Sequence, residues 1–209
     1  IIKEAGIPIA APSANISGRP SPTKAKHVYE EMNGRVDGIV LGGDSNFGLE
    51  STVLDLTEET PMILRPGSIT KEVLEELLGE VKLDPSLSKK EDNQKAKAPG
   101  MKYKHYSPNA DVYIISGKRE NVATKINDMI KSNRDKGLKT GVMCISRNRE
   151  FYDGEVIDLG NSLEEVASNL FDALIEMDKK GVDVIYSEEF PKTGVGQAIM
   201  NRLLKSAGY

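Results

Sequence analysis

The sequence contains few of the residues that build disulfides and zinc sites. Its 209 residues include one cysteine, Cys144, so no internal disulfide can form and a disulfide-rich secreted scaffold is excluded. Cys144 lies in an apolar run, where a thiol usually serves packing, and we expect a reducing, cytoplasmic setting. The only two histidines, His27 and His105, lie far apart in the sequence, so no metal cluster is expected.

Long apolar runs and a large positive charge are also missing. No stretch approaches the roughly 18 to 20 apolar residues that span a bilayer, so we expect no membrane contact. The first residues lack the Met, the basic start and the long apolar stretch of a signal peptide. A net charge of −4 does not suggest a nucleic-acid-binding surface, although it is compatible with a local basic patch.

The glycines form neither of the common phosphate-binding motifs. Neither GxxxxGK[ST] nor GxGxxG follows a predicted strand, which excludes a Walker loop and a dinucleotide fingerprint. Gly194 and Gly196 precede a predicted helix, and we interpret them as the start of that helix, with anion binding as the alternative.

The distribution of apolar residues predicts an α/β protein in two parts joined by a polar segment. Residues 84–98 contain no large apolar side chain except Leu87, and such a stretch cannot bury enough surface to order itself. We therefore predict a linker there, and divide the chain into residues 1–83, a connecting segment at 84–109 and residues 110–209.

Short helix-like and strand-like segments alternate in the first part. The chain begins like the tail of a helix that ends at Gly6, which suggests a fragment. Two short apolar runs joined by a polar, proline-ended link predict a hairpin. In order, we predict a helix end over 1–5, a strand from Ile7, a helix over 22–33, a strand over 36–41, the hairpin of 53–56 with 62–64, and a helix capped by Thr70.

Residues 110–209 alternate strands and helices at the spacing of right-handed crossovers. This predicts an open, mainly parallel sheet with helices on both sides. Ser162 and Glu165 form a capping box at the start of one helix. The predicted strands span 111–116, 140–146, 155–159 and 182–186, and the predicted helices span 121–133, 163–177 and 196–207.

The first candidate site lies in residues 7–23, IPIAAPSANISGRPSPT. An apolar run is followed by small polar residues, among them Ser13, Asn15 and Ser21, spaced by a glycine and prolines. A rigid strand followed by hydroxyls, an amide and a glycine presents donors to a phosphorylated ligand. The alternative is an ordinary turn, because the same residue types favour turns for local backbone reasons.

The predicted hairpin supplies the second candidate site. Ser51 and Thr52 enter one strand at its open end and Arg65 leaves the other. Because adjacent strands lie about 4.8 Å apart, this geometry brings a hydroxyl and a guanidinium together. An arginine at a rigid strand end suits bidentate phosphate binding. The alternative is a surface arginine paired with Glu50 or Glu72.

The third candidate, residues 102–108, lies just beyond the linker and contains His105. Two lysines, two tyrosines and a histidine in so short a segment suit a phosphate or a nucleotide ring. The alternative is an exposed basic strand. His27 falls in a predicted helix, and we interpret it as structural.

Four motifs, APSANISGRPSPT, GLESTVLDL, ILRPGSIT and APGMKYKHYSP, occur in an order that resembles the threonylcarbamoyl-AMP synthase family in its longer two-domain form. The resemblance covers residues 1 to about 108. In that family a YrdC-like catalytic domain is joined by a linker to a Rossmann-like C-terminal domain. The resemblance implies that residues 1–83 are the C-terminal part of the YrdC-like domain, that 84–109 form a linker with a nucleotide-facing segment, and that 110–209 are the Rossmann-like domain.

The family forms threonylcarbamoyl-AMP and pyrophosphate from L-threonine, bicarbonate and ATP, with Mg²⁺. The resemblance implies the same nucleotidyltransferase activity, with the product passed to the machinery that modifies an adenosine beside the anticodon of tRNA. The implied nucleotide-binding residues are Ser13, Asn15, Ser21, Arg65 and His105. The implied threonine pocket is lined by Ser51 and the backbone at Ala11. The resemblance implies that Arg65 is catalytic and acts by stabilising negative charge. Neither a covalent nucleophile nor a protein ligand for a metal is expected.

The chain departs from the family at one point. The family's KxR motif, which holds the triphosphate, precedes the SxN motif, and neither Lys24-Ala-Lys26 nor Lys102-Tyr-Lys104 matches it. We therefore expect that the first part of the catalytic domain is missing. On that expectation the chain by itself is weakly active or inactive, and residues 1–80 are incompletely packed.

Two other functions remain open. The first is a YrdC-like module that binds RNA without catalysis and contacts tRNA weakly through residues 102–106. Salt-dependent tRNA binding without any effect of ATP would favour it. The second is a small-ligand sensor formed by residues 110–209, a function that analogy between folds alone does not establish.

Overall fold

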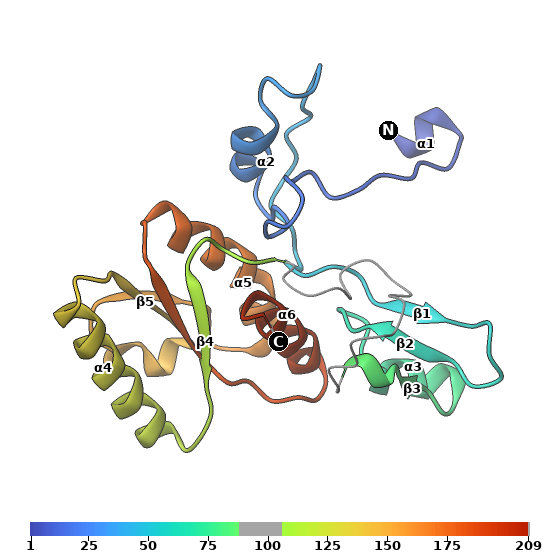
Figure 1. The fold of residues 1–209 in the computed structure, drawn as a ribbon. Helices are drawn as coiled ribbons and strands as arrows, with labels where there is room; N and C mark the ends of the chain where they lie inside the picture. Colours follow the sequence, from blue (N-terminus) through green and yellow to red (C-terminus); the bar gives the residue numbers. More distant parts are fainter. Residues whose placement is uncertain (88–105, 209) are drawn as a thin grey trace.

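The computed structural model of the protein describes residues 1–87 and 106–208. Most of the predicted linker, and with it the candidate residue His105, lies outside the described residues. Figure 1 shows a small sheet beside a larger sheet that lies between helices. Two helices, α1 (Ile2–Ala5) and α2 (Ala25–Met32), precede both sheets in the chain. None of the helices in residues 1–87 and 106–208 is long and apolar enough to cross a membrane.

The larger sheet confirms the prediction for residues 110–209. Its strands are β4 (Asp111–Ile115), β5 (Thr140–Cys144), β6 (Glu155–Asp158) and β7 (Val184–Glu188). Its helical segments are α4 (Arg119–Asp135), the 3-10 turn η2 (Ser146–Phe151), α5 (Leu163–Lys179) and α6 (Val195–Ser206). All four strands are parallel, in the order β4-β7-β5-β6. Helix α4 connects β4 to β5 and helix α5 connects β6 to β7, and a buried apolar cluster lies on each face of the sheet.

Apolar periodicity in the helices explains the two layers. Val122 and Ile126 of α4 share a buried cluster with Cys144 on one face of the sheet. Leu170 and Leu174 of α5 belong to the cluster on the other face, together with side chains of α6. Cys144 is fully buried, as predicted, and this burial raises the pKa of its thiol to about 12.

Both predicted helix starts in this part are confirmed. The hydroxyl of Ser162 accepts a hydrogen bond from the N–H of Glu165 at 3.2 Å, and α5 begins there. The Glu165 carboxylate accepts from the N–H of Asn161 at 2.5 Å, one residue before the cap. Gly194 is the cap of α6, and its N–H donates to the carboxylate of Glu72 at 3.3 Å. The anion at this helix start is therefore a side chain of the protein itself.

The smaller sheet contains the predicted hairpin. Its elements are β1 (Val53–Asp55), β2 (Met62–Arg65), α3 (Lys71–Leu78), β3 (Lys82–Leu83) and the 3-10 turn η1 (Pro85–Leu87). Strands β1 and β2 pair antiparallel, as predicted. Strand β3 pairs parallel to β2 and was not predicted, because two residues are too few to form a hydrophobic pattern. Thr70 and Gly79 bound α3, although no side chain caps its first turn.

Two predicted strands are wrong. Residues 7–11 and 36–41 form no strand, and nearly all of their side chains are exposed. A strand needs a hydrogen-bonded neighbour, and within residues 1–87 and 106–208 no strand pairs with either run. The apolar face of α3 is exposed as well, with Val73 at 44% and Leu77 at 79%. Most of the exposed large apolar side chains of the described chain lie in residues 1–80, which agrees with the incomplete packing predicted there.

Residues 46–49 connect the two parts by packing on α5. Phe47 and Leu49 pack with the apolar cluster that α5 and α6 form on the larger sheet. The hydroxyl of Ser168 on α5 donates to the carbonyl of Asn46 at 2.8 Å. A Cβ at Gly48 would lie 2.2 Å from the carbonyl oxygen of Ser168, so only glycine permits this approach.

We predict that Gly48→Ala destabilises the protein by about 1 to 3 kcal/mol, because the methyl group must push α5 away from this segment. Chemical denaturation followed by circular dichroism measures the change. Gly38→Ala is the matched control, since no atom lies within 4 Å of its added Cβ. An equal effect of the two substitutions would contradict the close packing of Gly48 on α5.

Candidate active site

The open end of the hairpin brings two of the predicted site residues together. Arg65 lies opposite Val53, next to an irregularity in the strand register. Its Nε donates a hydrogen bond to the carbonyl oxygen of Ser51 at 3.1 Å. The proximity predicted from strand spacing is therefore confirmed, with the backbone of Ser51 as the acceptor. The hydroxyl of Thr52 donates to the carbonyl of Ile69 at 2.6 Å, which fixes the same strand entry.

The backbone after Arg65 lies directly against the backbone around Ser51. A Cβ at Gly67 would lie 2.3 Å from the amide nitrogen of Thr52 and 2.7 Å from the carbonyl oxygen of Glu50. Glycine at this position lets the two segments touch. The segment that carries Ser51 and the segment that carries Arg65 are therefore in direct backbone contact.

Glu50 connects these two segments to α6. Its Oε2 accepts from Nε of Arg202 at 2.7 Å, and its Oε1 accepts from the hydroxyl of Ser21 at 3.0 Å. Arg202 has no exposed surface, and its Nη2 also donates to the carbonyl of Pro66 at 3.0 Å. Ser21, a predicted nucleotide contact, is thereby hydrogen-bonded to the residue that directly precedes Ser51.

The other candidates in the first stretch have only local hydrogen bonds in the described structure. Ser13 and Ala11 are exposed, and the backbone carbonyl of Ser13 accepts from the N–H of Asn15 at 3.0 Å. The side-chain amide of Asn15 donates to the carbonyls of Ile16 and Arg19, as in an ordinary turn. Within residues 1–87 and 106–208, no hydrogen bond joins Ala11, Ser13 or Asn15 to the hairpin. Their binding roles stay predictions.

The last candidate, His105, lies outside the described residues, but its neighbour Tyr106 is described. Tyr106 is buried and its ring stacks on Phe171 of α5, with centroids 5.1 Å apart. The guanidinium of Arg202 lies 5.7 Å from the Tyr106 ring centroid. Burial, followed by the charge of Glu50, raises the pKa of the Tyr106 hydroxyl. The chain therefore enters the second part of the molecule next to Glu50 and Arg202.

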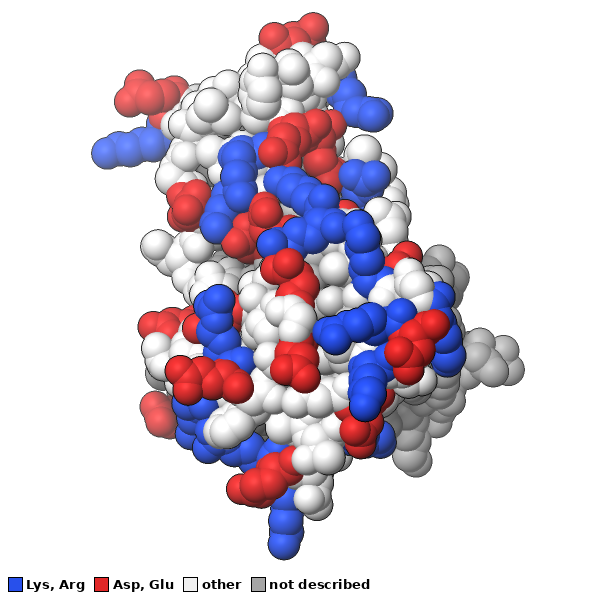
Figure 2. Space-filling view, turned by 90° about the vertical axis from the view of Figure 1, so that its left-hand side faces the viewer, with Lys and Arg blue, Asp and Glu red and all other residues white. Residues whose placement is uncertain are grey.

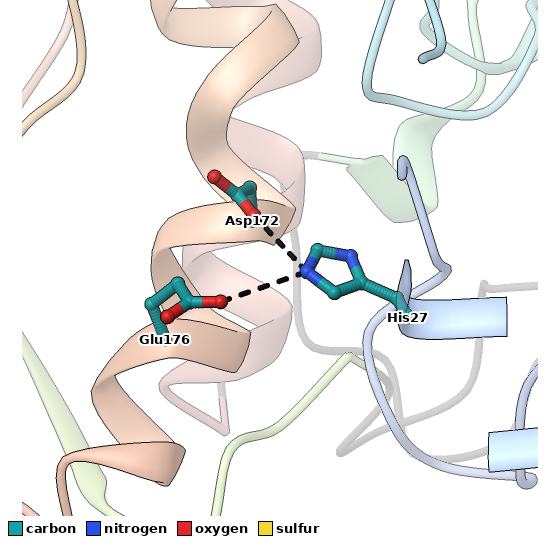
Figure 3. Close-up of side chains that lie close together, drawn as sticks. All are labelled: His27, Asp172 and Glu176. Carbon is teal, nitrogen blue, oxygen red and sulfur yellow. Dashed lines mark ion pairs between the residues drawn. The ribbon is translucent and has the colours of Figure 1, made fainter. Parts of the chain in front are cut away.

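A second polar cluster lies between α2 and α5. Figure 3 shows His27 of α2 pointing toward Asp172 and Glu176 of α5. Its Nε2 lies 3.1 Å from Oδ1 of Asp172 and 3.7 Å from Oε1 of Glu176. One ligand atom from each residue lies within 4.8 Å of the others, so the three have the spacing of a metal site. The prediction that no metal cluster forms rested on the histidines and the cysteine. It did not consider this group, because two of its three members are carboxylates.

Lysines already neutralise the carboxylates of this cluster. Lys24 lies 2.6 Å from Oδ2 of Asp172, while Lys26 and Lys179 lie 2.8 and 3.3 Å from Oε1 of Glu176. A metal ion would have to displace these ammonium groups. We therefore assign the cluster to the contact between α2 and α5, which agrees with the structural role predicted for His27.

The larger sheet has a cavity of about 320 Å³ where β4, β5 and β7 end. Arg119 and Arg147 line it, as does Asn148, whose Nδ2 donates to the buried Glu188 at 2.6 Å. Ligands of parallel α/β sheets commonly bind at this edge. The sensor function considered for residues 110–209 would use this cavity, and it stays a prediction.

Four residues have a part in the site that was not predicted: Glu50, Pro66, Tyr106 and Arg202. The sequence carries one signal for Arg202, which is its place in the apolar helical run AIMNRLL. A cation in such a run is buried only if it is paired. Its partner Glu50 is 152 residues away, and no local pattern identifies it.

Comparison with known proteins assigns both parts of the chain. A family model described as "Threonylcarbamoyl-AMP synthase, C-terminal domain" matches residues 69–208. A second model, described as "Telomere recombination", matches residues 1–67. The chain is 48% identical to the threonylcarbamoyl-AMP synthase of Pyrococcus abyssi over 203 residues, which cover 97% of this chain and 58% of that protein. It is 46% identical to the Bacillus subtilis enzyme over 211 residues, or 100% of this chain and 59% of that protein.

A solved structure shares the fold. The crystal structure of Pyrococcus abyssi Sua5 complexed with L-threonine superposes with a TM-score of 0.89 at 46% sequence identity. The match covers 100% of this chain and 60% of that chain. The chain therefore spans less than two thirds of the relatives it matches. Both sheets and their arrangement belong to the shared part.

The α2–α5 contact makes stability depend on pH. Burial lowers the pKa of His27, against the opposing effect of Asp172, so the folded protein favours the neutral imidazole. The unfolded chain takes up a proton near pH 6.5, and stability is therefore lost as the pH falls below that value. The ammonium groups of Lys26 and Lys179 hold the pKa of Glu176 at about 2, so its contribution is lost only under more acidic conditions.

We predict that His27→Gln weakens the pH dependence of unfolding between about pH 7.5 and 5.5. Urea denaturation at both pH values measures it. The wild-type protein should lose stability on acidification, while the variant should lose less. Parallel behaviour of both proteins would contradict the assignment of a neutral, buried His27.

Proposed function

This chain belongs to the threonylcarbamoyl-AMP synthase family, and we propose that the full-length protein forms threonylcarbamoyl-AMP and pyrophosphate from L-threonine, bicarbonate and ATP. The product would pass to the machinery that modifies tRNA, in the cytoplasm where ATP and tRNA occur. The low activity expected for the 209-residue chain by itself stays a prediction.

One observation carries this proposal: the contact between Arg65 and Ser51 at the open end of the hairpin. It places a guanidinium beside a strand entry that offers a hydroxyl, and each residue lies in one of the motifs of the family. The likeness to a structure complexed with L-threonine supports a threonine pocket, and we propose that Ser51 and the backbone of Ala11 line it.

The reaction requires the protein to align the substrates and to stabilise negative charge on the phosphates. An oxygen of the threonine carbamate attacks the α-phosphate of ATP, a P–O bond forms, and the bond to the departing pyrophosphate breaks. Negative charge on the phosphates is stabilised by a guanidinium that is already held in place, and we assign this part to Arg65. The hydroxyls of Ser51 and Ser21, with Ser13, Asn15 and His105, would hold the substrates in line.

We expect no protein ligand for Mg²⁺ at the open end of the hairpin. Mg²⁺ in nucleotide sites is usually bound by one or two carboxylates together with the phosphates. Glu50 is the carboxylate that contacts this end of the hairpin, and its two oxygens already accept from Ser21 and Arg202. We therefore propose that Mg²⁺ enters the site bound to ATP.

The alternative, an RNA-binding module without catalysis, receives little support from the face that Figure 2 shows. Figure 2 shows one face of the molecule, on which basic and acidic side chains lie next to one another. A backbone-binding surface for RNA would need basic residues gathered on one face. The segment 102–106, on which the alternative depends, lies largely outside the described residues.

We predict that Arg65→Ala in the full-length protein lowers pyrophosphate release by a factor on the order of 10² to 10³. The reaction contains L-threonine, bicarbonate and ATP, and a coupled phosphate assay follows it. Arg134→Ala, an exposed arginine near the end of α4, is the control and should keep the wild-type rate. Wild-type rates for Arg65→Ala would refute its role, and threonine-independent release by the wild-type protein would refute the activity.

A further inference from the structure

Arg202 is the largest side chain in the described structure that is fully buried, and it is charged. It lies on α6, in the part of the molecule that contains the parallel sheet. All of its nitrogens donate hydrogen bonds: Nε to Glu50 at 2.7 Å, Nη1 to Asn201 at 2.8 Å, and Nη2 to the carbonyl of Pro66 at 3.0 Å. A buried guanidinium persists only when its donors are satisfied in this way.

The acceptors of Arg202 lie on both sides of the Ser51–Arg65 contact. Glu50 directly precedes Ser51 in the chain, and Pro66 directly follows Arg65. Nη2 also lies 3.4 Å from the carbonyl oxygen of Glu50, so one guanidinium contacts the backbone that precedes β1 and the backbone that follows β2. Lysine cannot reproduce this arrangement, because it presents one ammonium group where arginine presents a planar fork.

We propose that Arg202 is a positioning residue for the reaction, through which α6 fixes the distance between Ser51 and Arg65. The proposal rests on the proposed function, since it assigns the threonine pocket to one of these residues and the phosphates to the other. Arg202 acts through Glu50 and Pro66 and contacts neither substrate. It thereby gives the Rossmann-like part a role in a reaction whose other assigned residues lie before it in the chain.

Other contacts are available to hold the two parts of the molecule together. Lys24 pairs with Asp172 between α2 and α5, and Gly48 packs on α5. Neither contact includes a residue of the hairpin. Loss of Arg202 therefore frees the open end of the hairpin, whereas loss of Lys24 does not.

The test uses the full-length protein with Arg202→Met, Arg202→Lys and Glu50→Gln, and with Lys24→Met as a control that also breaks an ion pair between the two parts. Three quantities are measured: the melting temperature, the Kd for L-threonine by calorimetry, and kcat for pyrophosphate release. Misplacing reacting groups by about 1 Å costs on the order of 10²-fold in rate. We expect a loss of that size in kcat for Arg202→Met, with weaker threonine binding.

The two milder variants keep the proposal falsifiable if Arg202→Met does not fold. Arg202→Lys retains the charge and loses the fork, and Glu50→Gln retains the shape and loses the charge, so both should give intermediate losses. Lys24→Met should lower the melting temperature and leave Kd and kcat at wild-type values.

Each outcome separates the proposal from the function on which it rests. Wild-type Kd and kcat in Arg202→Lys and Glu50→Gln, with an active wild-type protein, would overturn the positioning role and leave the function intact. Equal losses of threonine binding and kcat in the Arg202 variants and Lys24→Met would show that Arg202 only holds the two parts of the molecule together, and would overturn the proposal. A wild-type protein without threonine-dependent pyrophosphate release would refute the proposed function, and the positioning role with it.

Discussion

The ion pair between the buried Arg202 and the partly buried Glu50 is the interaction on which the arrangement of the site depends. Removing Glu50 would leave the buried guanidinium uncompensated, and such a loss costs about 3 to 5 kcal/mol. The pair joins residues 152 positions apart, and it brings Ser21, the hairpin and α6 to one place. Gly67 lets the backbone after Arg65 approach the backbone of Glu50 and Thr52, because a Cβ at this position would clash with both residues.

The second connection between the two parts has a different physical basis. Between α2 and α5, lysines and carboxylates alternate around His27, and most of these groups retain some contact with solvent. Pairs of this kind contribute little individually and are screened by salt. The side chain of Arg202 is sealed from water, so its pair with Glu50 determines geometry more strictly. The contact between α2 and α5 thus adds to the packing of residues 46–49 on α5, while the pair of Arg202 and Glu50 sets the position of the hairpin's open end.

How far the sequence predicts this structure depends on the range of the interactions. The parallel sheet, its helices and the hairpin follow from local patterns, such as the stripe from Val166 to Met177 and the link that ends at Pro61. The runs at 7–11 and 36–41 have the composition of strands and form none, since a strand also needs a partner that composition does not supply. The meeting of Ser51 and Arg65 was predictable because a hairpin brings its own two ends together.

The parts of the site that escaped prediction all depend on contacts between distant segments. Nothing near Arg202 in the sequence identifies Glu50, and nothing near His27 identifies Asp172. Of the residues in the motifs that resemble the threonylcarbamoyl-AMP synthase family, Ser51 and Arg65 meet at the hairpin, and the roles of the others stay predictions. The motifs did not indicate that a helix from the other part of the molecule holds these two residues.

Hydrogen–deuterium exchange, read by mass spectrometry on the full-length protein, tests most directly whether Arg202 fixes the hairpin. If it does, Arg202→Met should speed exchange in peptides that cover residues 50–53 and 65–67, while peptides that cover β5 exchange as in the wild-type protein. Unchanged exchange at the hairpin would show that its open end is held without Arg202, and would contradict the positioning role of this residue.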